Sequence, residues 1–197
     1  ALNSFLPKDV RVLDARVVGD QFDARRSARL RVYRYQLLSG RQLPHLQRYA
    51  FWIRRSIRLE VLNRIAAAII GEHDFTTFAA SGSAGTSAVR HVVQASFFVE
   101  GPMIIFRIAA TSFLWKMVRS LVGTMLEIES DTDQESAEAE ERMSGLLCNR
   151  IREQAGQTAP PWGLFLERVF FTDDTSRVKA PPMDKSSLHG IDCFPNG

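Results

Sequence analysis

A regular alternation over residues 28–35 constrains the fold of this chain more than any other stretch. Small or apolar side chains alternate there with arginine and tyrosine, and this period of two is typical of a β-strand with two unlike faces. The apolar face suits a core, whereas the other face interleaves guanidinium groups with aromatic rings. Such a surface favours a polyanion that carries flat bases, although solvent-facing strands can have the same composition. The expected faces are Ala28, Leu30 and Val32 on one side, and Arg29, Arg31, Tyr33 and Tyr35 on the other.

Charge is distributed unevenly along the 197 residues. The chain has 25 Lys and Arg, 22 Asp and Glu, and a formal net charge of +3. Residues 127–141 alone hold eight acids and no base, so the rest of the chain is strongly basic. Most of the bases are arginines, which contact phosphate through a planar, bidentate fork. This balance predicts a nucleic-acid partner rather than a membrane surface.

Cysteine usage and hydropathy restrict the class of protein further. The two cysteines, Cys148 and Cys193, lie far apart, which argues against a disulfide framework or a metal cluster and for a reducing compartment such as the cytoplasm. No run approaches the roughly 20 apolar residues of a membrane span. Residues 1–7 contain no initiator Met, no cap and no leader pattern, so we expect this chain to be the interior of a longer protein.

The remaining sequence predicts strands and helices in one domain. Residues 41–56 are expected to be a connecting loop with some extended structure. The acidic residues 127–141 are expected to be a solvated loop before a third helix, whose apolar face would be Met143, Leu146, Leu147 and Ile151. Together these elements predict an α+β fold, with an antiparallel or mixed sheet, helices on one face and the other face open to a partner. Residues 1–175 would form this domain and residues 176–197 a poorly ordered tail. Strands are expected at residues 10–18, 28–38, 89–99, 103–110 and 164–171, of which 89–99 and 103–110 would form a hairpin around Glu100-Gly101-Pro102. The other helices are expected at residues 58–70, where Leu62 and Ile65 recur at helical spacing, and at residues 113–128.

Five stretches together resemble one family, tRNA pseudouridine synthase A. They occur in the order of the family and at roughly its spacing, which makes the set far more specific than any single match. The stretches are ALNSFLP at residues 1–7, FDARRSA at residues 22–28 running into Tyr33-Arg34-Tyr35, GEHDF at residues 71–75, FLWKMVR at residues 113–119 with Val122-Gly123, and TAPPWGLFL at residues 158–166.

The resemblance implies an RNA isomerase that converts uridine to pseudouridine in the anticodon stem-loop of tRNA. It implies a pseudouridine-synthase-like fold, a homodimer, no cofactor and no metal. By the same resemblance, Tyr33 stacks on the target base, Arg119 pairs with the catalytic carboxylate, and Leu164 packs against the reacting base. Without the family context these three residues would be interpreted as a strand tyrosine, a solvated arginine and a core leucine. The basic residues expected to contact RNA are Arg25, Arg29, Arg31 and Lys116.

The sequence also departs from the family pattern. Trp115-Lys116 stands where Tyr-His or a similar pair is usual, and Ser120 stands where Asn is usual. The nucleophilic aspartate of the family lies in a Gly-Arg-Thr-Asp motif, and no such motif occurs in these 197 residues. We therefore expect the chain to be inactive alone. The alternatives are an RNA-binding module without catalysis, or an interaction domain whose arginine-rich strand is only a solvated face.

Overall fold

The computed structural model of the chain describes residues 2–80, 87–133 and 137–171, so the expected tail at residues 176–197 lies outside it. The described part is an α+β fold, as predicted, with a six-stranded sheet and three helices. Five short 3-10 turns connect these elements, of which η2 (Pro44–Leu46), η3 (Thr76–Phe78) and η5 (Pro161–Gly163) matter below. The strands are β1 (Leu30–Ser39), β2 (Phe51–Ile53), β3 (Gly71–Asp74), β4 (Val89–Glu100), β5 (Met103–Ala110) and β6 (Leu164–Phe170), and the helices are α1 (Leu59–Ala67), α2 (Met117–Asp131) and α3 (Glu138–Asn149).

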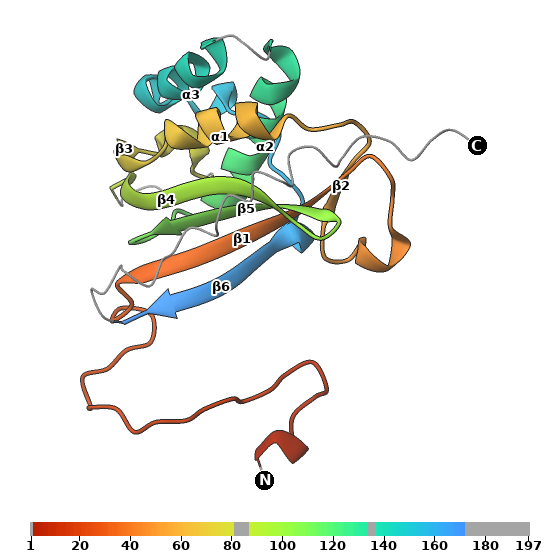
Figure 1. Cartoon of the computed structure of the whole chain (residues 1–197). Helices are drawn as coiled ribbons and strands as arrows, with labels where there is room; N and C mark the ends of the chain where they lie inside the picture. The colour runs from red at the N-terminus through yellow and green to blue at the C-terminus, as the bar shows by residue number, and fades with distance from the viewer. Residues whose placement is uncertain (1, 81–86, 134–136, 172–197) are drawn as a thin grey trace.

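Strand β1 is the central element of the sheet, whose order is β2-β1-β5-β4-β3 with β6 also paired to β1 (Figure 1). One edge of β1 pairs antiparallel with β5. The other edge is divided, because β6 pairs antiparallel with residues 30–35 and β2 pairs parallel with residues 37–39. Strands β4 and β5 form the predicted hairpin, and Gly101 adopts a φ of +57° at its turn.

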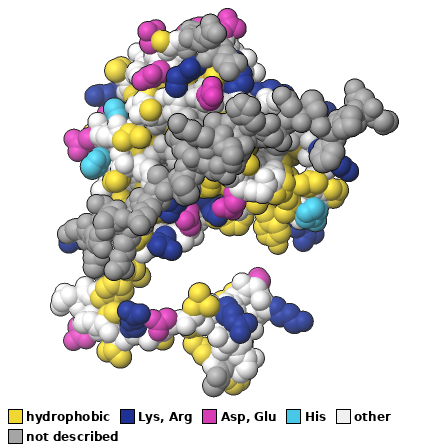
Figure 2. Space-filling model, in the orientation of Figure 1, with side chains coloured by type: hydrophobic (Ala, Val, Ile, Leu, Met, Phe, Trp, Pro, Cys, Tyr) yellow, Lys and Arg dark blue, Asp and Glu magenta, His cyan; other side chains and the backbone are white. Residues whose placement is uncertain are grey.

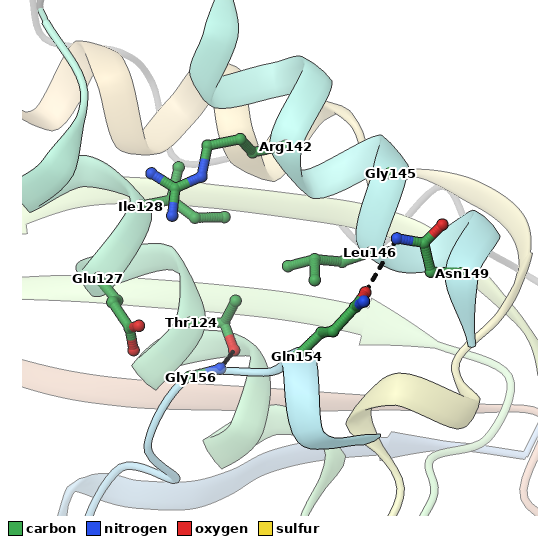
Figure 3. A pocket seen from close by; sticks show the side chains of 9 residues that line it. All are labelled: Thr124, Glu127, Ile128, Arg142, Gly145, Leu146, Asn149, Gln154 and Gly156. Carbon is green, nitrogen blue, oxygen red and sulfur yellow. Dashed lines mark hydrogen bonds between the residues drawn. The ribbon is translucent and has the colours of Figure 1, made fainter. Parts of the chain in front are cut away.

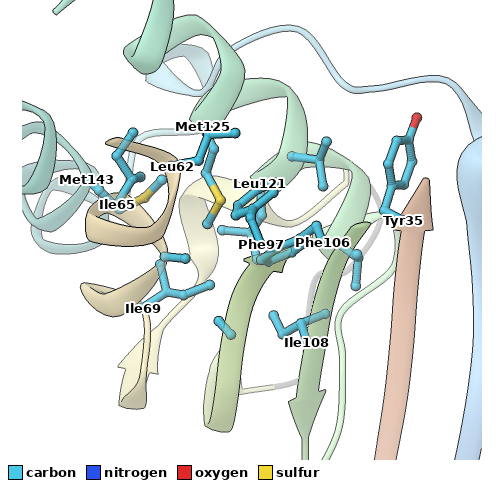
Figure 4. Close-up of a cluster of buried hydrophobic side chains, with 14 of the residues drawn as sticks. Tyr35, Leu62, Ile65, Ile69, Phe97, Phe106, Ile108, Leu121, Met125 and Met143 are labelled. Atoms are coloured by element: carbon cyan, nitrogen blue, oxygen red, sulfur yellow. The ribbon is translucent and has the colours of Figure 1, made fainter. Parts of the chain in front are cut away.

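The three helices cover one face of the sheet and bury the main core between the two layers (Figure 1). Leucine, isoleucine and methionine side chains from the helices meet aromatic and branched side chains of β4, β5 and β1 (Figure 4). In the sheet layer, the rings of Phe97 and Phe106 stack with centroids 4.5 Å apart. Helix α1 also covers the open edge of β4, where the Asn63 amide exchanges two hydrogen bonds with the backbone of Phe97. The labelled core residues are Tyr35, Leu62, Ile65, Ile69, Phe97, Phe106, Ile108, Leu121, Met125 and Met143.

The two faces of β1 have the predicted members, but their environments differ from the prediction. Tyr33 and Tyr35 point toward the helical layer, and Tyr35 is completely buried in the main core. Leu30 and Val32 belong to a second, smaller cluster with Ala109 and Phe170. The aromatic face is therefore not an open RNA-binding surface. Composition alone could not decide this, because a tyrosine can be buried wherever its hydroxyl finds an acceptor.

The strand expected over residues 10–18 is absent, so that prediction is wrong. This segment is extended but pairs with no strand of the described chain, and it runs apart from the sheet (Figure 1). Leu13 is 91% exposed and Val17 is fully exposed. An alternating pattern specifies a strand only where a neighbouring strand supplies hydrogen bonds and a core covers the apolar face.

The acidic run was also predicted wrongly as a solvated loop. Its beginning completes α2, and residues 138–141 form the first turn of α3, where negative charge favours the helix N-terminus. Glu129 is fully buried and forms ion pairs with Arg55 and Arg58, which hold the β2–α1 connection against α2. Helix α2 begins at Met117 rather than residue 113, because Lys116 adopts a left-handed conformation with a φ of 62°. No helix in the described ranges is long and apolar enough to cross a bilayer.

Candidate active site

A short segment, residues 156–160, runs along α2 and connects that helix to β1. We call it the α2 strap. At its start, the backbone N–H of Gly156 donates to the Thr124 hydroxyl at 2.9 Å (Figure 3). One residue later the strap passes so close to Gly123 that a Cβ there would lie 1.8 Å from the Gln157 carbonyl oxygen. Glycine at position 123 thus permits the close approach of helix and strap.

Arg119 holds the middle of the strap through two reciprocal hydrogen bonds with Ala159. The Arg119 Nε donates to the Ala159 carbonyl at 2.7 Å, and the Ala159 N–H donates to the Arg119 carbonyl at 3.0 Å. The side chain is half-buried. No carboxylate in the described part of the chain forms an ion pair with it. Arg119 is therefore fixed in position while its positive charge remains available.

Tyr35 attaches the end of the strap to the sheet. Its buried hydroxyl donates to the Pro160 carbonyl at 2.7 Å. Burial raises the pKa of Tyr35 well above its ordinary value, and the nearby positive charge of Arg119 opposes this shift without cancelling it. Tyr35 therefore stays neutral and keeps donating its hydrogen bond, so that β1, the strap and Arg119 form one connected unit.

Leu164 and Tyr33 lie beside this unit on neighbouring strands. Leu164 is the first residue of β6 and pairs with Tyr35 across the sheet. Tyr33, two residues before Tyr35 on the same face, pairs with Leu166 at an irregularity in the β1–β6 register. Its ring is half-buried and meets the edge of Phe113 at a centroid distance of 5.0 Å. The structure thus brings together the three stretches that carry Tyr33, Arg119 and Leu164.

Comparison with known proteins identifies the family of the chain. A family profile described as tRNA pseudouridine synthase matches residues 65–172. The chain is 43% identical over 183 residues to tRNA pseudouridine synthase A of Treponema denticola, covering 92% of this chain and 66% of that relative. The chain belongs to the tRNA pseudouridine synthase family. The synthases of the same name from Borrelia duttonii and Borreliella burgdorferi are 36% and 39% identical, each covering 87% of this chain and 68% of the relative. The chain therefore spans about two thirds of the length of these curated relatives.

The four basic residues expected to bind RNA lie in different environments. Arg31 donates to the carbonyls of Arg25, Ala28 and Thr111, so its guanidinium holds the loop before β1 in place. Arg25 and Arg29 are exposed near that loop. Lys116 is exposed at the start of α2, with its Nζ 4.7 Å above the ring of Trp115. RNA contact by Arg25, Arg29, Arg31 and Lys116 stays a prediction.

Two cavities border the strap. The larger, about 670 Å³, lies between the strap, β2 and the second half of α2, and carries Arg55, Glu127 and Asp131 among apolar side chains. The smaller, about 250 Å³, lies between α2, α3 and the start of the strap (Figure 3). No group of three or more His, Cys, Asp or Glu suited to a metal ion occurs among residues 2–80, 87–133 and 137–171.

The sequence analysis missed the residues that support the α2 strap and Tyr33. Phe113 was noted only as the first residue of an expected helix and of the FLWKMVR stretch, and the carbonyls of Ala159 and Pro160 were not considered as acceptors. The signal that could have identified the strap is Gly123 seven residues into α2 together with a Pro-Pro-Trp-Gly run, since both indicate a backbone packed closely on a neighbour.

Proposed function

We propose that this protein acts in the conversion of uridine to pseudouridine in the anticodon stem-loop of tRNA, as a homodimer in the cytoplasm. The observation that carries the proposal is the connected unit of Arg119, Ala159, Pro160 and Tyr35. This unit supports a rigid wall on which the positive charge of Arg119 lies beside the strands that carry Tyr33 and Leu164. Such a wall suits the binding of an uncharged planar base beside a carboxylate.

The proposed reaction moves the ribose from N1 to C5 of the same uracil. The glycosidic bond breaks, the base rotates, a carbon–carbon bond forms, and the hydrogen on C5 leaves as a proton while N1 gains one. A carboxylate is required as the nucleophile and a base must accept the C5 proton. In this scheme Tyr33 stacks on the target base, which is worth about 1–3 kcal/mol per base. Leu164 packs on the base from the adjoining strand, and Arg119 keeps the carboxylate ionised.

We further propose that the nucleophile is not one of the aspartates of these 197 residues. Several of them already have structural partners. The Asp23 carboxylate accepts the backbone N–H groups of Arg25 and Arg26. Asp74 accepts from Thr76 and forms an ion pair with Arg150. The additional length of the relatives supports a nucleophile that lies outside this sequence.

Tritium release from tRNA labelled at uridine C5 tests the proposal, because the C5 hydrogen leaves only when the new bond forms. We would assay this chain alone and joined to the upstream region that carries the Gly-Arg-Thr-Asp motif in the family. Release by the longer protein alone is the expected result. Release by the chain alone would identify one of its own aspartates as the nucleophile, and no release by either would refute the isomerase assignment. Sedimentation of the longer protein tests the homodimer.

A further inference from the structure

A long stretch of this chain carries arginines and no acidic residue. Between Asp23 and Glu60 there is no Asp or Glu. Several arginines of this stretch nevertheless have partners from elsewhere in the fold. Arg34 forms an ion pair with Glu100, and Arg55 and Arg58 share the buried Glu129. The arginines of the stretch that lack such partners therefore mark where its positive charge reaches solvent.

Three of them lie on the connection that joins β1 to β2 and on the end of β2. Arg41, Arg48 and Arg54 are exposed, and none forms an ion pair in the described part of the chain. Tyr49, in the same connection, is 53% exposed. We call Arg41, Arg48, Tyr49, Trp52 and Arg54 the loop surface. Figure 1 shows this connection projecting at the right-hand end of the molecule, and Figure 2 shows basic and hydrophobic side chains together at that end.

The loop surface is held in place by the sheet. The Trp52 indole N–H donates to the Gly40 carbonyl at 2.8 Å, and the Gly40 N–H donates to the Ile53 carbonyl at 2.9 Å. The guanidinium of Arg54 lies 5.1 Å from the centre of the Trp52 ring. Because β2 pairs with the end of β1, these side chains keep a fixed position relative to the candidate active site.

We propose that the loop surface is a second RNA-binding site, which contacts the phosphate backbone of the substrate at a distance from the target nucleotide. This inference rests on the proposed function. Ser39 lies six positions after Tyr33 on β1, and a strand rises about 3.3 Å per residue, so the loop surface begins roughly 20 Å from the ring expected to hold the target base. A single nucleotide does not span that distance, but a folded RNA does.

The chemistry of the loop surface favours RNA over other partners. Arginine forks match phosphate oxygens, and the exposed ring of Tyr49, beside the half-buried Trp52, offers a flat face to an unpaired base. Neutralising phosphates releases counterions, so each arginine that contacts the backbone contributes to the salt dependence of binding.

The double variant Arg48→Ala/Arg54→Ala tests the inference, with Arg142→Ala/Arg150→Ala as a control of equal charge on the helical layer. Arg142 and Arg150 form ion pairs with Asp131 and Asp74, and we expect them to contact no RNA. The full-length protein is titrated with intact tRNA and with a hairpin whose stem is too short to reach 20 Å from the target nucleotide. Fluorescence anisotropy at several salt concentrations gives the affinity and its salt slope, and thermal melting confirms that both variants fold.

We expect the loop-surface variant to bind intact tRNA about tenfold more weakly, with a salt slope lower by about two, while binding the short hairpin like the unmodified protein. An equal loss for the short hairpin, or an equal loss in the control variant, would overturn the inference alone. If the unmodified protein binds neither RNA, the proposed function fails and the inference fails with it.

Discussion

Arg119 and Ala159 are joined by two hydrogen bonds of opposite direction, although 40 residues separate them in the sequence. The Arg119 side chain donates to the Ala159 carbonyl, and the Ala159 N–H donates back to the Arg119 carbonyl. This pairing fixes the α2 strap along the side of the helix. The position of Pro160, and through it of Tyr35, therefore depends on the same contacts that orient Arg119.

Gly123→Ala tests the close approach of helix and strap. The new Cβ would lie 1.8 Å from the Gln157 carbonyl oxygen, so the strap must move away from α2. We expect the free energy of unfolding to fall by about 1–3 kcal/mol, as for other overpacked sites. Urea denaturation measures this change.

Gly145→Ala is the matched control, since this glycine lies in α3 with no heavy atom within 4 Å of an added Cβ. Alanine has the higher helix propensity, so this variant should gain up to about 1 kcal/mol. A destabilisation of equal size in both variants would contradict the contact between strap and helix.

Arg119→Lys keeps a positive charge but lacks the Nε–H that reaches the Ala159 carbonyl. We expect a loss of about 1–2 kcal/mol in the free energy of unfolding, because a charge-assisted hydrogen bond is removed. In the protein that carries the nucleophile, we also expect a large loss of kcat with little change in tRNA affinity. Tritium release and filter binding separate the two effects, and a variant with unchanged kcat would exclude a role of the Arg119 geometry in catalysis.

Tyr35→Phe removes the hydroxyl that donates to Pro160. The variant should lose about 1 kcal/mol near neutral pH, since a buried carbonyl loses its partner. Burial raises the pKa of folded Tyr35, so above pH 10 the unfolded chain loses this proton while the folded chain retains it.

The contribution of Tyr35 is therefore complete below pH 10 and decreases as the pH rises beyond that value. Melting temperatures measured from pH 8 to about 11 should fall less steeply for the phenylalanine variant than for the unmodified protein. Parallel curves would show that Tyr35 ionises in the folded state as it does in the unfolded chain.

Tyr33→Ala should reduce catalysis far more than it reduces binding of bulk tRNA. Loss of one stacked ring predicts a decrease in kcat/KM of roughly 10- to 100-fold. Tyr33→Phe keeps the ring and its edge contact with Phe113, so it should retain most of the activity. Equal losses in catalysis and in bulk binding of the alanine variant would contradict the stacking role.

Local patterns predicted the elements that depend on local chemistry. Glu100-Gly101-Pro102 between two β-branched runs predicted the β4–β5 hairpin, and the spacing of Leu62 and Ile65 predicted α1. Alternation also assigned Tyr33 and Leu30 to opposite faces of β1. These features are determined by backbone sterics and by the side-chain period.

The environment of each face could not be predicted, because it depends on residues distant in sequence. Tyr35 is buried since Pro160 offers an acceptor 125 residues later, and Glu129 is buried since Arg55 and Arg58 reach it from the β2–α1 connection. The left-handed Lys116 delays the start of the second predicted helix to Met117, and no glycine in the sequence indicates this. At the candidate site, the sequence motifs named Tyr33, Arg119 and Leu164 as candidates, but no local pattern indicated the carbonyls of Ala159 and Pro160 as hydrogen-bond acceptors.

The divided edge of β1 has a consequence for the order in which the protein forms during synthesis. β1 leaves the ribosome long before β6, the last described strand, yet the two are direct neighbours in the sheet. β1 can pair with β2 and β5 and pack on α2 while the edge that β6 later occupies is still unpaired. The pairing of Tyr35 with Leu164, in contrast, requires nearly the whole described chain. Such non-local pairings form slowly, so the wall of the candidate site is completed last.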